Sequence, residues 1–135
     1  MSDGMLIARA TATGRAPPYA VAITAGHHAL AADEPKSIGG GDSGPSPFAL
    51  VASGLGACTA ITLRMYAERK QWPLRGVTVA LTVVKGADDA LQIERSVTLE
   101  GELSAEQRAR LAEIAEKTPV TKALRAGFAI HTSFR

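Results

Sequence analysis

The chain has 135 residues, of which 46% are hydrophobic and 21% charged, a composition typical of an ordinary globular protein with one domain over residues 1–135. The net charge is +2 and the basic residues form no run, so the sequence gives no support to a nucleic-acid partner. Because Cys58 is the single cysteine, an intramolecular disulfide and a cysteine-rich zinc site are excluded. The N-terminus resembles no signal peptide, and one free thiol fits a reducing compartment, so we expect a cytoplasmic location.

Three short stretches rich in apolar residues predict strands over residues 5–13, 18–24 and 27–33. Residues 33–47, DEPKSIGGGDSGPSP, are dense in glycine and proline and show no periodicity, which predicts a loop. The pieces on either side are too small to be independent domains. We therefore interpret the segment as a functional loop over one edge of the domain and not as a linker.

A long helix is predicted from residue 47 to about residue 70. Ser46 is a suitable N-cap, and Pro47 suits the first helical position because its missing N–H would have no partner there. Residues 48–63 are apolar or small on all sides, which predicts burial on all sides. Gly54 and Gly56 lower the helix propensity by about 1 kcal/mol each, so they indicate a bend or a close neighbour at the backbone. A membrane span needs about 20 strongly apolar residues, and the prolines and glycines around this helix favour a buried core helix with no membrane partner.

The second half predicts a hairpin, two helices and a final strand. Alternating apolar residues over 77–83 and 93–99 flank a turn at 85–90. Ser104 and Gln107 form a capping box for a helix whose apolar face includes Leu111 and Thr118. A shorter helix over 120–125 ends at Gly127, and alternation over 128–134 predicts the last strand.

The predicted order is β-β-β-α-β-β-α-α-β, an α+β fold with a mostly antiparallel sheet. A chain of this length has difficulty burying a helix on all sides by itself. We therefore expect a homodimer in which two such helices pack together between two sheets.

Three stretches resemble the OsmC/Ohr family. Residues 32–58, ADEPKSIGGGDSGPSPFALVASGLGAC, are similar to the family segment that ends at its reactive cysteine. Residues 62–74 resemble the exit of the same helix, and residues 99–124, LEGELSAEQRARLAEIAEKTPVTKAL, resemble the segment around the second family cysteine. The resemblance covers nearly the whole chain and is closest to the OsmC-like branch. It implies an intertwined homodimer and thiol-dependent reduction of organic hydroperoxides.

The family uses two cysteines, an arginine that favours the thiolate, and a glutamate that holds the arginine. Cys58 falls on the peroxide-attacking cysteine, whereas Thr118 occupies the place of the resolving cysteine. The acidic residue before the attacking cysteine has no counterpart, since Phe48 and Ala49 stand there. Arg15 is the match for the family arginine. The implied catalytic set is therefore Cys58, Arg15 and Thr118.

Two functions stay open at this point. The first is a one-cysteine thiol peroxidase, in which Cys58 forms a sulfenic acid and an external thiol reduces it. The second is a catalytically degenerate member that binds an apolar small molecule at the dimer interface, with Cys58 a small buried hydrophobe. Thr118 could donate a hydrogen bond to the peroxide or to Cys58, or act only at a helix end, and Arg15 could be a solvated turn residue. No cofactor or metal is expected, because the three histidines lack zinc-site spacing.

Overall fold

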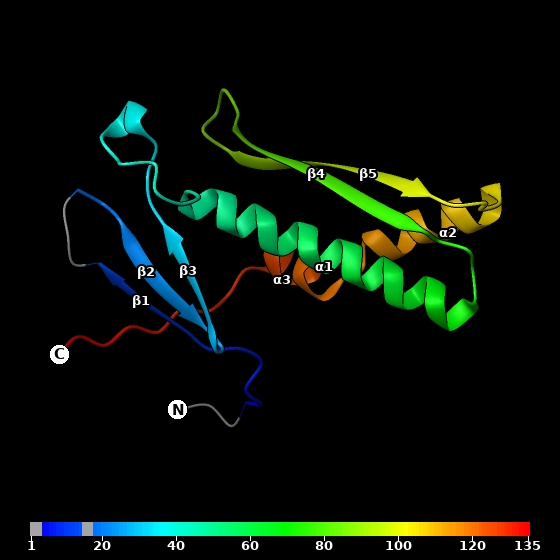
Figure 1. The fold of residues 1–135 in the computed structure, drawn as a ribbon, viewed down its shortest axis with the longest axis horizontal. Helices are drawn as coiled ribbons and strands as arrows, with labels where there is room; N and C mark the ends of the chain where they lie inside the picture. The colour runs from blue at the N-terminus through cyan, green and yellow to red at the C-terminus, as the bar shows by residue number, and fades with distance from the viewer. Residues whose placement is uncertain (1–3, 15–17) are drawn as a thin grey trace. The chain divides into compact units, whose positions relative to one another are not determined.

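The structure is a computed structural model that describes residues 4–14 and 18–135. The chain divides into two compact units, residues 1–51 and 52–135, and Figure 1 shows the elements of each. The α+β class and the antiparallel strand pairing are as the sequence predicts. The single domain over residues 1–135 stays a prediction.

The first unit contains a three-stranded antiparallel sheet with β2 in the middle. Its strands are β1 (Ala10–Gly14), β2 (Val21–Ala25) and β3 (His28–Ala32). The sequence predicts the first strand over residues 5–13, but backbone pairing begins only at Ala10. The reason is that Ala10 lies opposite Ala25, where β2 ends and the turn at Gly26 begins.

The glycine-rich loop after β3 is organised around one buried carboxylate, Asp33. This carboxylate accepts hydrogen bonds from the Ser43 hydroxyl at 2.6 Å, the Ser43 N–H at 3.1 Å and the Glu34 N–H at 2.7 Å. The bonds from Ser43, its hydroxyl first, hold the pKa of Asp33 below its ordinary value. The predicted loop is therefore an ordered segment, and it includes a short 3-10 helix, η1 (Lys36–Ile38).

Helix α1 (Pro47–Lys70) has the predicted bounds and the predicted cap. The Ser46 hydroxyl accepts the Ala49 N–H at 3.2 Å. The helix ends where Gln71 takes a left-handed conformation with φ of 60°. By length and composition alone α1 could cross a membrane, a test that the core helix of a soluble protein also passes.

The burial of α1 differs from the prediction, because only one face of the helix is buried. That face carries Ala52, Leu55, Gly56, Thr59, Leu63 and Ala67. On the opposite face Ile61 and Met65 are 58% and 54% exposed. Of the two glycines, Gly56 has a close neighbour, since a Cβ there would lie 2.7 Å from Cδ1 of Leu81, whereas nothing lies within 4 Å at Gly54.

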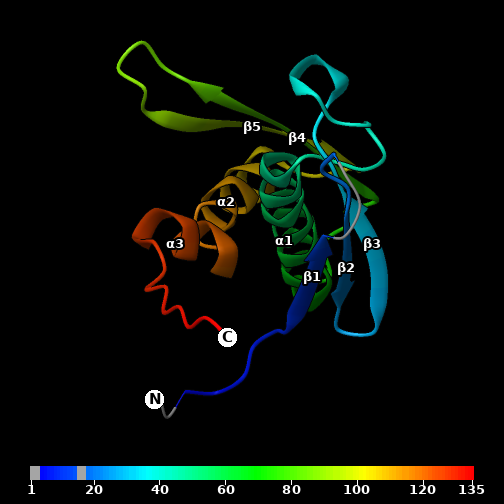
Figure 2. The same cartoon turned by 90° about the vertical axis from the view of Figure 1, so that its left-hand side faces the viewer.

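The second unit packs α1 against a long hairpin and two further helices, as Figures 1 and 2 show. The hairpin is β4 (Gly76–Lys85) and β5 (Leu91–Glu100), with Val79 opposite Val97. Helix α2 (Ala105–Ala115) begins with the predicted capping box, and α3 (Pro119–Ala126) ends at Gly127. Leu63 of α1 and Leu111 and Ala115 of α2 form the core, together with partly buried side chains of both strands.

The predicted last strand is not formed, because residues 128–134 have no regular secondary structure. Phe128, Ile130 and Phe134 are 69%, 83% and 95% exposed. The alternation of apolar residues is that of a strand, but a strand also needs a neighbouring edge to pair its backbone. No strand pairing of this segment occurs within the described part of the chain.

Candidate functional site

Cys58 lies near the middle of α1 and is partly exposed. Its Sγ is 3.8 Å from the hydroxyl of Thr62, one turn further along the same helix. Two groups of the α3 N-terminus, the Thr118 hydroxyl and the Val120 N–H, also act on the sulfur and lower the pKa of Cys58. The thiol is therefore held between one helix side and the beginning of another.

The N-terminus of α3 is built for this contact by its own sequence. Thr118 is the N-cap, and its hydroxyl accepts the Thr121 N–H at 3.2 Å. Pro119 follows at the first helical position and has no N–H to offer. The Val120 N–H is thus the first amide of the helix available to another group, and it points to Cys58.

These contacts change the acidity of the thiol. Burial acts first and raises the pKa of Cys58, but the Val120 N–H and the hydroxyls of Thr118 and Thr62 lower it, and the net pKa lies below the ordinary value. The physical cause is hydrogen bonding to the thiolate at a helix N-terminus, where the dipole also favours negative charge. Such a thiolate is more abundant at neutral pH, and the thiolate is the nucleophilic form.

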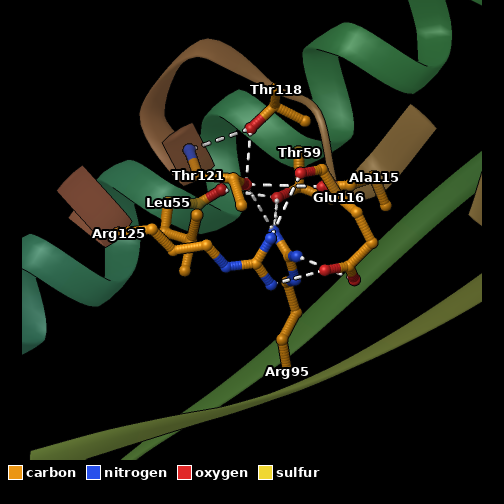
Figure 3. Close-up of polar contacts among 8 residues, drawn as sticks. All are labelled: Leu55, Thr59, Arg95, Ala115, Glu116, Thr118, Thr121 and Arg125. Carbon is orange, nitrogen blue, oxygen red and sulfur yellow. Dashed lines mark hydrogen bonds and ion pairs between the residues drawn. The ribbon is translucent and has the colours of Figure 1, made fainter. Parts of the chain in front are cut away.

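Thr118 also belongs to a partly buried polar network centred on Arg95 of β5, shown in Figure 3. The Nη1 of Arg95 donates to the hydroxyls of Thr59 at 3.0 Å and Thr121 at 2.9 Å. Its Nη2 is 3.3 Å from the carboxylate of Glu116, which also pairs with Arg125 at 2.5 Å. The side chain of Arg95 is only 11% exposed, so these bonds replace most of its contact with water.

A cavity of about 290 Å³ adjoins this network. Its lining is apolar at Leu55, Leu91, Ile93 and Leu124 and polar at Arg95, Thr121 and Arg125. A space of this size with apolar walls and a few converging polar groups can hold a small organic molecule.

Of the three predicted site residues, the structure brings Cys58 and Thr118 together. Thr118 caps α3, and its side chain is one of the groups that lower the pKa of Cys58. Its role in a reaction stays a prediction. Arg15 lies outside the described residues.

Sequence reasoning missed Arg95 and Glu116. One signal for Arg95 was present: along β5 it shares the alternating face of Ile93, Val97 and Leu99, which are all partly buried. An arginine on an apolar face must find partners for its charge, and such a position therefore indicates a buried polar network. Glu116, in the turn before α3, gave no signal that separates it from other surface glutamates.

Two features characterise this protein: its α+β fold and a hydrogen-bonded thiol that lies between two helices. The sequence matches the family described as OsmC-like protein over residues 39–133. Because this match spans more than half of the chain, the protein belongs to the OsmC-like family. A comparison with curated proteins gives no match.

Solved structures show the same fold. The OsmC-like protein of Mycoplasma pneumoniae superposes with a TM-score of 0.76 at 19% identity, covering 92% of this chain and 89% of that one. The organic hydroperoxide resistance protein OsmC of Legionella pneumophila gives 0.66 at 20% identity, with 91% and 92% covered. The organic hydroperoxide resistance protein OhrB of Bacillus subtilis gives 0.62 at 24% identity, with 89% and 91% covered. At these identities the likeness establishes the fold alone.

Proposed function

We propose that the protein reduces organic hydroperoxides with Cys58 as its single redox thiol. The family relatives are organic hydroperoxide resistance proteins, which supports a general role in the response to oxidative stress. The observation that carries the finer proposal is the set of donors around the sulfur, which lowers the pKa of Cys58 despite its burial. A thiol that served only as packing would need no such donors.

The reaction starts from the thiolate. The sulfur attacks one peroxide oxygen, the O–O bond breaks, and the departing alkoxide takes a proton to become an alcohol. Cys58 is left as a sulfenic acid. Because the chain has one cysteine, an external thiol attacks this sulfur, releases water and forms a mixed disulfide. A second external thiol then restores the thiolate.

Thr118, at the place of the family's resolving cysteine, donates to the sulfur and cannot form a disulfide. Arg15 supplies a cation to the bound peroxide in this proposal. The reducing partner is a thiol of a reducing compartment, in keeping with the expected cytoplasmic location. A homodimer completes the proposal, supported by the exposed apolar side chains of Ile61, Met65 and Phe128.

A second candidate function is the binding of an apolar small molecule without turnover. The cavity beside Arg95, with its four aliphatic side chains, favours it. In that case the donors around Cys58 are structural and the thiol has no reactivity beyond that of an ordinary buried cysteine.

Intact-mass spectrometry with a sulfenic-acid trap tests the two functions. The native protein is treated with cumene hydroperoxide, and the adduct is followed over time, with Cys58→Ser as the matched control. We expect one adduct per chain on the native protein and none on the control. Labelling that begins only after denaturation would reject the peroxidase and favour the binding function.

A further inference from the structure

A second cavity, of about 260 Å³, lies between strand β5 and helix α2. Cys58 is not among its lining residues, and it shares only Arg95 with the lining of the cavity of about 290 Å³ described above. Its walls are almost all aliphatic and come from three elements: Leu63 of α1, Val97 and Leu99 of β5, and Leu111, Ala112 and Ala115 of α2. This space is therefore a separate candidate site, which the reaction proposed for Cys58 does not use.

The spacing of residues along α2 gives the cavity the form of a groove. Leu111 and Ala115, one turn apart, are buried and form its floor. Arg108, Ala112 and Glu116 recur every four residues, so they share one side of the helix, and they are exposed along the rim. With a rise of about 1.5 Å per residue, the rim from residue 108 to residue 116 is about 12 Å long. A medium-length aliphatic chain can lie along such a groove.

One charged group at the rim, the guanidinium of Arg108, has no ion pair with any residue that the structure describes. Its Nη2 donates to the Gly101 carbonyl at 3.3 Å, and this is its one side-chain hydrogen bond within residues 4–14 and 18–135. An arginine offers several N–H donors in a planar fork that suits a carboxylate. Arg108 is thus held at one point by the backbone and keeps its other donors for a ligand oxygen.

At the opposite end of the groove the charges already compensate one another. The Glu116 carboxylate pairs with Arg125 and Arg95, and these cations, Arg125 above all, hold the pKa of Glu116 below its ordinary value. Over the lining of the groove, Arg95 and Arg108 against Glu116 leave a net positive charge. Aliphatic walls with an uncompensated cation at one end match a ligand that has an apolar body and one anionic group.

We propose that the groove between β5 and α2 binds a small amphipathic anion, a monocarboxylate with an unbranched aliphatic chain. The carboxylate pairs with Arg108, and the chain lies on Leu111 and Ala115, where it is removed from water. None of the lining residues is a nucleophile, so the molecule is held without reaction. The inference concerns binding alone and does not depend on the proposed function of Cys58.

Isothermal titration of the native protein tests this site with two probes, octanoate and octanamide, which have the same chain and differ in charge. We expect octanoate to bind more tightly, and its affinity to fall with rising ionic strength, because salt screens an exposed pair with Arg108. Arg108→Gln should weaken octanoate binding by about threefold or more and remove most of the salt dependence. Arg110→Gln is the matched control, since Arg110 also belongs to α2 but does not line the cavity, and it should leave the affinity unchanged.

Two further variants distinguish the two cavities. Ala112→Phe places a ring in the groove from an exposed position and should abolish binding of both probes. Leu124→Phe narrows the cavity of about 290 Å³ instead and should leave octanoate binding unchanged. Cys58→Ser should bind octanoate like the wild type, so a failure of sulfenic-acid labelling and a failure of this site are seen separately. Equal affinities for the two probes, absence of octanoate binding, or loss of binding in Leu124→Phe with none in folded Ala112→Phe would each overturn the inference.

Discussion

Thr118 joins two elements through a single oxygen atom. Its hydroxyl oxygen accepts the Thr121 N–H that opens α3, and the same hydroxyl is one of the groups that lower the pKa of Cys58 on α1. An N-cap contributes about 1 kcal/mol to stability, so folding alone holds this oxygen in position. The hydroxyl that acts on Cys58 is thus preorganised by the helix and does not depend on a bound substrate.

A second residue-scale case is Asp33, whose buried carboxylate accepts several hydrogen bonds from its loop. Its pKa is lowered, mainly by Ser43, from an ordinary value of 3.8. The stability it contributes is therefore present above 3.8 and is lost as the pH falls through the lowered folded pKa.

We expect Asp33→Asn to lower the thermal unfolding midpoint at neutral pH, and the difference from wild type to narrow toward about pH 3. Asp42→Asn, an exposed change on the same loop, should have little effect at either pH. A difference between Asp33→Asn and wild type that is constant with pH would show that the ionised carboxylate is not the source of stability.

At the scale of elements, the contact between α1 and β4 is set by Gly56. A Cβ at this position would lie 2.7 Å from Cδ1 of Leu81, closer than packed atoms allow. Glycine lowers the helix propensity at this position, but because it has no side chain it allows α1 to lie close to the strand.

A double-mutant cycle tests this contact by chemical denaturation. Gly56→Ala should cost stability when Leu81 is present and should gain some of it back with Leu81→Ala, since the smaller side chain frees the space. We expect a coupling of about 1 kcal/mol between the two changes. Strictly additive effects would mean that Leu81 moves away without cost.

The elements that the sequence predicted well are those fixed by local signals. The Ser46 cap, the capping box at Ser104 and the hairpin turn all depend on residues within a few positions of one another. The strand over residues 128–134 failed because pairing needs an edge that the local sequence cannot specify. Cys58 and Thr118 were found through the family resemblance, whereas the partners of Arg95 lie 36 and 26 residues away in the chain and only the fold brings them together.

At the scale of the whole molecule, one face of α1 leaves apolar side chains exposed, and an exposed apolar face favours contact with a partner. Ala57 is exposed there, and Ile61 and Met65 are more than half exposed. A second copy that covers this face would reconcile the predicted burial on all sides with the burial seen in one chain. The exposed apolar residues of the segment 128–134 would also gain a neighbour in such a dimer.

We expect the wild-type protein to be a dimer by light scattering coupled to size exclusion, and Ile61→Glu to shift it toward the monomer, because a charge in an apolar interface is costly. Ala105→Glu, an exposed change on α2, should leave the mass unchanged. A monomeric wild type at all concentrations would reject the dimer, and dimeric Ile61→Glu would exclude this face as its interface.

The unpaired segment 128–134 has a consequence for solubility. Its alternating apolar residues make no strand pairing within the described part of the chain, and Phe128, Ile130 and Phe134 are largely exposed. A segment of this kind can pair with the strand edge of another copy, which makes aggregation at high concentration its main liability in solution.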